Sequence, residues 1–324
     1  MSAAEAWLLA RAAGASFVLT LVLARLAPRV GWTDAPRGAD AARKLQGRAV
    51  PAVGGLALLL VLLAGGELGA SSDALWGAHL PGERARLLTL ALVFTVGALD
   101  DRRPLAPGPK SLAQLVALAP LAIGNGNASL AWGLALVALG FLLVNVLNTF
   151  DNADGALALL AALGLAPVLP LASAAALGFL PLNLDAGRAA NRASRAPSAY
   201  LGDAGAFLLA LLVLYRPPAL GLVVLPFLDL VRLTWVRWRA GSRPWLGDRR
   251  HLAHRCEARG LTRPVTALVL AALAAPAALG VPLACARGSA LLGAAAVGLT
   301  LALFLAALRW APDPLPCPGA RASE

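Results

Sequence analysis

The sequence predicts an all-α, polytopic integral membrane protein with about ten or eleven transmembrane helices. Three observations indicate this fold class. Of the 324 residues, 59% are hydrophobic and only 14% are charged, whereas soluble domains carry about a quarter charged residues. Long apolar runs recur along almost the whole chain. The formal net charge of +11 comes from basic residues that gather between alternate runs, as they do in cytoplasmic loops.

Each candidate span is an apolar run that is long enough to cross a bilayer, or a shorter one that fits inside a helix bundle. The runs lie near residues 6–26, 50–66, 85–99, 111–124, 130–150, 155–169, 171–184, 205–215, 218–236, 265–285 and 288–309. We expect residues 1–310 to form one transmembrane domain and the Pro-rich residues 311–324 to be a disordered tail. The three cysteines, Cys256, Cys285 and Cys317, are spaced too widely for a metal site, so we interpret them as free thiols.

The distribution of Arg and Lys predicts the orientation of the chain. One set of alternate loops holds most of the basic residues, with the largest group in residues 237–263, and the opposite set holds few. Because cytoplasmic loops carry the excess of Arg and Lys, this pattern places the N-terminus outside. In a membrane protein such a charge balance marks the loops, so we expect no nucleic-acid partner.

Two adjacent carboxylates, Asp100 and Asp101, end the third candidate span. Adjacent carboxylates repel each other and raise each other's pKa unless a cation or a basic group lies between them. One interpretation is an acidic helix end that Arg102 and Arg103 balance. The other is a site for Mg²⁺ or for acid–base chemistry on a phosphate, because hard cations prefer carboxylate oxygens.

A second polar cluster closes the apolar run of residues 130–144. Its amides and carboxylates follow one another at short intervals: Asn145, Asn148, Asp151, Asn152 and Asp154. For any one of them, a polar helix end that continues into a loop is the ordinary explanation. The whole series exceeds what helix capping requires, and unpaired carboxylates beside lipid are costly. We expect the helix to end near Asn148 and the carboxylates to lie in a turn before the next span.

Two more polar segments follow. In the motif Tyr200-Leu-Gly-Asp203-Ala-Gly205, glycines on both sides let the Asp203 carboxylate approach a ligand closely, although a helix-capping role for Asp203 is the alternative. The last basic loop is either a segment that contacts anionic lipid or an anion clamp of guanidinium and imidazole groups. His251 and His254 have no further His or Cys to complete a tetrahedral set, so we do not expect zinc.

Carboxylates for Mg²⁺, amides and an Arg/His cluster on one membrane face together indicate phosphoryl transfer on a diphosphate substrate beside lipid. In this order the motifs resemble those of the polyprenyl-phosphate N-acetylhexosamine-1-phosphate transferases (glycosyltransferase family 4). The resemblance covers roughly residues 34–260 and rests on five motifs: Arg43–Lys44 with residues 51–55, Asp100–Asp101 with Lys110, the series 145–155, residues 200–205 with Pro226 and Asp229, and residues 248–255. The Asp-Asn-x-Asp form at 151–154 is more similar to the undecaprenyl-phosphate N-acetylglucosamine-1-phosphate transferase branch than to the phospho-N-acetylmuramoyl-pentapeptide transferase branch.

The resemblance implies an active site on the cytoplasmic face of the bacterial inner membrane. It implies transfer of N-acetylhexosamine-1-phosphate, with GlcNAc-1-phosphate as the first choice, from a UDP-sugar to undecaprenyl or another polyprenyl phosphate. UMP is released, Mg²⁺ (or Mn²⁺) is required, and the step begins a cell-envelope glycan such as lipopolysaccharide. The expected partners are the UDP-N-acetylhexosamine, the polyprenyl phosphate and membrane lipid, and a homodimer stays open.

Carried onto this chain, the family's functional residues fall into four groups. Asp203 would bind the metal, and Asp100 and Asp101 would be catalytic, handling the lipid phosphate or the metal. The nucleotide would be bound by Asn148, Asp151, Asp154 and Tyr200, with Tyr200 stacking on uracil. The phosphates and the sugar would be bound by Lys44, Lys110, Asn145, Arg249, Arg250, His251, His254 and Arg255.

The sequence also departs from the family. Residues 38–42 are an insertion in the first motif, Gln46 and Ala253 stand where relatives have His, and Ala206 replaces a Ser. The acidic positions are intact, so we expect catalysis, by direct attack or through a covalent Asp intermediate. Two other functions stay open: a transporter of polyprenyl lipid or nucleotide sugar, and a catalytically impaired homologue that binds lipid.

Overall fold

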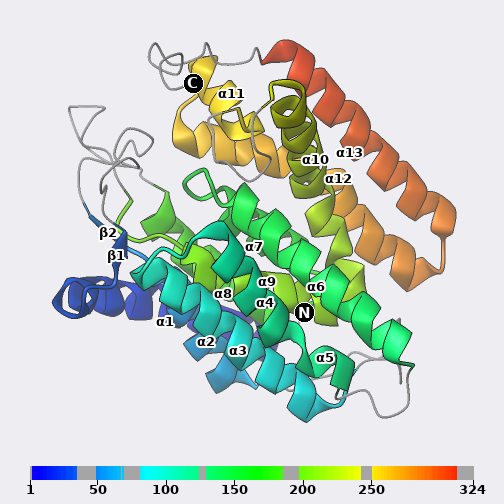
Figure 1. Cartoon of the computed structure of the whole chain (residues 1–324). Helices are drawn as coiled ribbons and strands as arrows, with labels where there is room; N and C mark the ends of the chain where they lie inside the picture. The colour runs from blue at the N-terminus through cyan, green and yellow to red at the C-terminus, as the bar shows by residue number, and fades with distance from the viewer. Residues whose placement is uncertain are drawn as a thin grey trace.

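The computed structural model describes residues 2–34, 49–66, 68, 81–123, 129–184, 197–241 and 250–311, and most of these are helical (Figure 1). The α-helices are α1 (Ala3–Leu26), α2 (Gly54–Gly65), α3 (Glu83–Arg102), α4 (Pro107–Leu118), α5 (Pro120–Ile123), α6 (Leu130–Phe150), α7 (Ala156–Leu165), α8 (Pro170–Asn183), α9 (Gly202–Tyr215), α10 (Val224–Arg239), α11 (Leu252–Ala258), α12 (Arg263–Arg287) and α13 (Ala290–Trp310). Two 3₁₀ segments are η1 (Ala27–Val30) and η5 (Pro217–Val223). The expected disordered tail lies outside the described residues except for Ala311.

Five helical segments of the described chain are long and apolar enough to cross a membrane. They are α1 with η1, α6, η5 with α10, α12 and α13. Their outer faces carry large apolar side chains, such as Leu291 and Leu299 on α13, that no other part of the described chain covers. A helix that is apolar on its exposed face as well as its packed face suits contact with lipid. The architecture is therefore that of a polytopic membrane protein, as the sequence predicts.

Shorter apolar helices fill the centre of the fold. Every side chain of α9 from Ala204 to Tyr215 is buried. Two glycines allow neighbouring helices to touch its backbone: a Cβ on Gly97 of α3 would lie 2.6 Å from the Ala204 nitrogen, and one on Gly55 of α2 would lie 2.3 Å from the Gly205 nitrogen. No larger residue fits either position. This close packing sets the C-terminal end of α3 directly beside the first turn of α9.

Two short strands, β1 (Thr33–Asp34) and β2 (Val50–Pro51), pair antiparallel between α1 and α2, with Thr33 opposite Pro51. They are the one departure from an all-α fold among the described residues. At the other end of the chain α12 and α13 form a hairpin at Gly288, whose φ of 61° suits a left-handed helix C-cap. In Figure 1 α10 packs beside this hairpin, and α11 lies near one end of it.

The helices follow the predicted spans with a few differences. The sixth span follows the prediction: α6 ends at Phe150, two residues past Asn148, and residues 151–155 form the expected turn before α7. The run 111–124 is divided at Ala119, since Pro120 has no N–H for the helix ladder. The run 218–236 starts as a 3₁₀ segment at a Pro-Pro pair. The short polar helix α11 was not predicted, because it has no apolar run.

Candidate active site

Four helices bring polar side chains together around the Lys110 ammonium group. Lys110 Nζ, on α4, lies 2.9 Å from Asp100 Oδ2 at the end of α3 and forms an ion pair with Asp203 Oδ2 on α9. With its amide oxygen turned toward the ammonium, Asn148 of α6 accepts from Lys110 Nζ at 3.2 Å and donates to Asp203 Oδ1 at 2.8 Å. Three motifs that are far apart in the sequence therefore meet at one point, as the resemblance implies.

Asp101, the neighbour of Asp100, faces the start of α9. Its two carboxylate oxygens accept from the backbone N–H groups of Asp203 at 2.7 Å and Ala204 at 3.1 Å. Gly202 makes the approach possible, because its φ is +78° and a Cβ there would lie 2.6 Å from an Asp101 oxygen. Asp101 thus caps α9 from another helix and fixes the backbone that carries Asp203. Its expected catalytic role stays a prediction.

The first motif reaches the same place through its backbone. The N–H groups of Gly54 and Gly55 donate to the carbonyl oxygens of Tyr200 and Leu201, each at 2.9 Å, and the Tyr200 N–H donates to Pro51 at 2.8 Å. The strand end and the first turn of α2 therefore hold the segment that precedes Asp203. Lys44, which the resemblance places in this motif, lies outside the described residues.

Asp151 follows α6 directly and is a carboxyl group in unfavourable surroundings. Burial raises its pKa well above the usual range, and the negative charges of Asp203, Asp101 and Asp154 add to this effect. The described part of the chain gives its carboxylate no hydrogen bond, so the ionised form has little to compensate it. A group held in this way is a candidate for function rather than for stability.

Replacing Asp151 with Asn should therefore stabilise the protein at pH 7 and lower any activity of the site. The folded-state pKa lies above the unfolded-state value near 4, so ionisation at neutral pH costs folding free energy, of the order of 1 kcal/mol or more. Near pH 4 the wild-type group is protonated in the folded state and about half protonated in the unfolded state, so the difference should be smaller there than at pH 7. Thermal unfolding in detergent at pH 4.5 and pH 7 measures this, and a lower Tm for Asp151→Asn at pH 7 would contradict it.

Asp154 and Tyr200 lie beside the start of α12. The Asp154 carboxylate forms an ion pair with the Arg263 guanidinium, in the first turn of that helix. Burial and the nearby Asp154 carboxylate raise the pKa of Tyr200, so the phenol is neutral. The structure thus places these two expected nucleotide-binding residues together, and it adds Arg263, which the sequence analysis missed because it lies outside the 248–255 motif, in the first turn of α12.

Asn183 is another residue that the sequence analysis missed. It is the last residue of α8, is 2% exposed, accepts from the Gly155 N–H at 3.0 Å and donates to the Ala199 carbonyl at 3.1 Å. It joins the turn after α6 to the segment before Tyr200, and so holds two motifs in register. A single Asn at the end of an apolar run carries no pattern that could have identified it.

Asn145 lies one turn before Asn148 on α6 and does not reach the Lys110 group. Its amide donates to Gln114 Oε1 at 3.0 Å and to the Phe141 carbonyl at 2.8 Å. In this structure it joins α6 to α4. A phosphate-binding or sugar-binding role for Asn145 stays a prediction.

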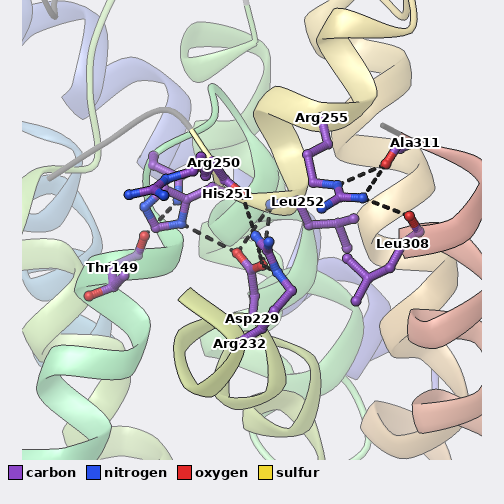
Figure 2. Close-up of polar contacts among 10 residues, drawn as sticks. Thr149, Asp229, Arg232, Arg250, His251, Leu252, Arg255, Leu308 and Ala311 are labelled. Carbon is purple, nitrogen blue, oxygen red and sulfur yellow. Dashed lines mark hydrogen bonds and ion pairs between the residues drawn. The ribbon is translucent and has the colours of Figure 1, made fainter. Parts of the chain in front are cut away.

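The histidine loop is held by α10. Figure 2 shows the Asp229 carboxylate facing His251, Leu252 and Arg232. Arg232 pairs with Asp229 Oδ1 at 3.1 Å and also donates to the Arg250 carbonyl. Burial lowers the pKa of His251, although its contact with Asp229 opposes that shift. Asp229 and Arg232, both on α10, therefore hold the His251 ring and the Arg250 backbone in place.

His254 and Arg255 use their side chains within the protein. His254 Nδ1 lies 3.4 Å from a carboxylate oxygen of Glu257, one turn further along α11. Arg255 is 7% exposed and donates to the backbone carbonyls of Ala311 and Leu308, the latter at 2.6 Å, where it caps the end of α13 (Figure 2). The expected contact of these two residues with the diphosphate stays a prediction, and Arg249 lies outside the described residues.

Comparison with known proteins supports the resemblance to this family. No family model matches the chain. Curated relatives include the undecaprenyl-phosphate alpha-N-acetylglucosaminyl 1-phosphate transferase of Yersinia pestis, which is 24% identical over 311 residues, covering 82% of this chain and 80% of that protein. The enzyme of the same name from Salmonella typhi is 26% identical over 301 residues, covering 79% of this chain and 77% of that protein.

A third relative, from Bacillus subtilis (strain 168), is a probable undecaprenyl-phosphate N-acetylglucosaminyl 1-phosphate transferase, 24% identical over 298 residues that cover 78% of this chain and 77% of that protein. All three names denote the branch that the motifs resemble. The predicted resemblance is confirmed. These N-acetylglucosaminyl 1-phosphate transferases match the chain over about four fifths of its length.

Proposed function

We propose that the chain is a phosphoglycosyl transferase of the cytoplasmic membrane of a bacterium. It transfers N-acetylhexosamine-1-phosphate, in the first place GlcNAc-1-phosphate, from a UDP-sugar to undecaprenyl or another polyprenyl phosphate and releases UMP. The active site lies on the cytoplasmic face of a bundle of about ten helices, of which the shorter ones enclose the site. The product is the first lipid-linked intermediate of a cell-envelope glycan.

The observation that carries this proposal is the group around Lys110. Asp100, Asp203 and Asn148 come from three helices and converge on a single ammonium group, with Asp101 and Asp151 close by. Four carboxyl groups around one ammonium group cannot all be ionised without a further cation, and a purely structural cluster would not need them. Such a site suits a substrate that arrives with a divalent cation.

The residues fit Mg²⁺ as a cofactor shared with the substrate. Among the described residues no three His, Cys, Asp or Glu side chains are grouped closely enough to hold a metal ion alone. Mg²⁺ commonly takes one or two carboxylates and completes its octahedron with water and substrate phosphates. Asp203 and Asp100, which point at the same ammonium, provide that pair. When bound there, Mg²⁺ would offset the charge of the diphosphate.

In the reaction a phosphate oxygen of the polyprenyl phosphate attacks the β-phosphorus of the UDP-sugar. A new P–O bond forms, the bond from that phosphorus to the bridging oxygen breaks, and UMP leaves with the bridging oxygen. A phosphate monoester has a second pKa of about 6 and is mostly dianionic at neutral pH, so the attacking polyprenyl phosphate needs no strong base. Lys110 can bind phosphate oxygens, and Asp100 can orient the attacking group.

The test is UMP release by the purified protein with undecaprenyl phosphate, Mg²⁺ and a panel of UDP-N-acetylhexosamines. We expect UMP with UDP-GlcNAc, and none when the lipid is left out. UMP release with a different UDP-sugar would support the proposed reaction and identify another donor. No UMP with any donor, from protein that is folded by its thermal unfolding profile, would contradict the proposal and favour a transporter or a lipid-binding role.

A further inference from the structure

Asp229 is a buried carboxylate that the proposed reaction leaves without a role. It lies in α10, is 3% exposed, and contacts Arg232 of its own helix as well as His251 and Leu252 at the start of α11. His251 Nδ1 lies 3.3 Å from Asp229 Oδ2, and the Leu252 backbone N–H donates to the same oxygen at 3.2 Å. One side chain therefore holds both the histidine ring and the backbone beside it (Figure 2).

These contacts determine which nitrogen of His251 carries the proton. Arg232 pairs with Asp229 at 3.1 Å, so the group is a carboxylate and can only accept hydrogen bonds. His251 Nδ1 must then be the donor. In the neutral ring the second nitrogen, Nε2, has no proton and presents a lone pair. Burial lowers the pKa of His251, which favours this neutral form at physiological pH.

The loop that carries His251 lies next to the proposed site. Figure 2 draws Thr149, in the last turn of α6, on the side of His251 away from Asp229. Thr149 is the neighbour of Asn148, which contacts Lys110 and Asp203. With Nδ1 held by Asp229, Nε2 is the ring nitrogen that remains for a substrate. It can accept a hydrogen bond from a protonated phosphate or from a sugar hydroxyl group.

We propose that Asp229 is a positioning residue that holds His251 as the Nδ1-protonated tautomer and presents Nε2 to the substrate. This inference rests on the proposed transferase function. Asp229 acts through His251 rather than on the substrate, so its removal should lower kcat by about tenfold to 100-fold, as is common for groups that orient a functional histidine. The KM values for both substrates should change much less.

The kinetic test is a double-mutant cycle of Asp229→Asn and His251→Ala. Asparagine keeps the size of the side chain and one acceptor for the Leu252 N–H, but it can also donate to Nδ1 and so removes the tautomer preference. If Asp229 acts through His251, the double variant should be as slow as His251→Ala alone. Losses that multiply would overturn the proposal, because they would indicate a separate structural effect. Val231→Ala, on the exposed face of α10, is the control and should keep wild-type rates.

A second measurement does not depend on activity. The chain has only three histidines, so ¹⁵N NMR of the histidine-labelled protein can assign His251 by the signal that is lost in His251→Ala. We expect a protonated Nδ1 and an unprotonated Nε2 in the wild type, and a mixed or reversed pattern in Asp229→Asn. A wild-type ring protonated at Nε2 would overturn the proposal. If the enzyme assay finds no activity with any donor, the transferase function fails, while this spectrum still decides the Asp229 contact.

Discussion

Replacing Asp203 with alanine should abolish transfer while the protein still folds. The Asp203 carboxylate faces both Lys110 and Asn148, so its loss removes the centre of the site. We expect kcat to fall by about 100-fold to 1,000-fold or more, the size of effect seen when a preorganised electrostatic group is lost. The fold should survive, because the N–H groups at the start of α9 are capped by Asp101 and not by Asp203 itself.

The matched control for this prediction is Thr95→Ala, an exposed position on α3 whose hydroxyl group donates to the Ala91 carbonyl of the same helix. It should keep wild-type activity and a wild-type Tm. An Asp203→Ala variant that retained more than a small fraction of the wild-type rate would contradict the assignment of the site to this cluster.

Replacing Lys110 with methionine should have the largest effect on stability. The ammonium group is the partner of both Asp100 and Asp203, and all three side chains are less than a quarter exposed. Without it the carboxylates repel one another, which should cost on the order of 3 kcal/mol and lower the Tm. Activity should be lost as well, because no cation then faces the substrate phosphates from α4.

This variant also tests the metal proposal without an activity assay. If a divalent cation can take a place beside Asp100 and Asp203, Mg²⁺ should raise the Tm of Lys110→Met more than that of the wild type. Lys110→Arg, which keeps the charge, should show a smaller loss of stability. An unchanged Tm for Lys110→Met, with no response to Mg²⁺, would show that the ammonium group does not hold the cluster together.

Much of the fold could be predicted from the sequence because the length of an apolar run is a direct physical signal in a membrane protein. The apolar run 130–150 forms α6 with the predicted bounds, and the run 265–285 lies within α12. The breaks were harder to predict. The helix boundary at Pro120 is visible in the sequence, whereas the contacts of Asn148 with Lys110 of α4 and Asp203 of α9 join segments that local sequence does not relate.

The candidate site shows the same limit. The sequence placed Asp100, Lys110, Asn148 and Asp203 in one site, and the structure brings them together. The sequence alone could not show which groups Asp101 binds, since these N–H groups are about a hundred residues away in the chain. Arg255 is similar: its basic character suggested phosphate binding, but its partners are the backbone carbonyls of Ala311 and Leu308, which carry no sequence signal.

The central claim is that the Lys110 cluster carries phosphoryl transfer from a UDP-sugar to a polyprenyl phosphate. Mass spectrometry of the lipid fraction, together with UMP quantification, tests it most directly on the purified protein in vesicles that contain undecaprenyl phosphate and UDP-GlcNAc. The predicted result is undecaprenyl-diphospho-GlcNAc and UMP in equal amounts from the wild type, and neither from Asp203→Ala. Intact UDP-GlcNAc that moves across the vesicle membrane, with no lipid-linked sugar formed, would contradict the claim.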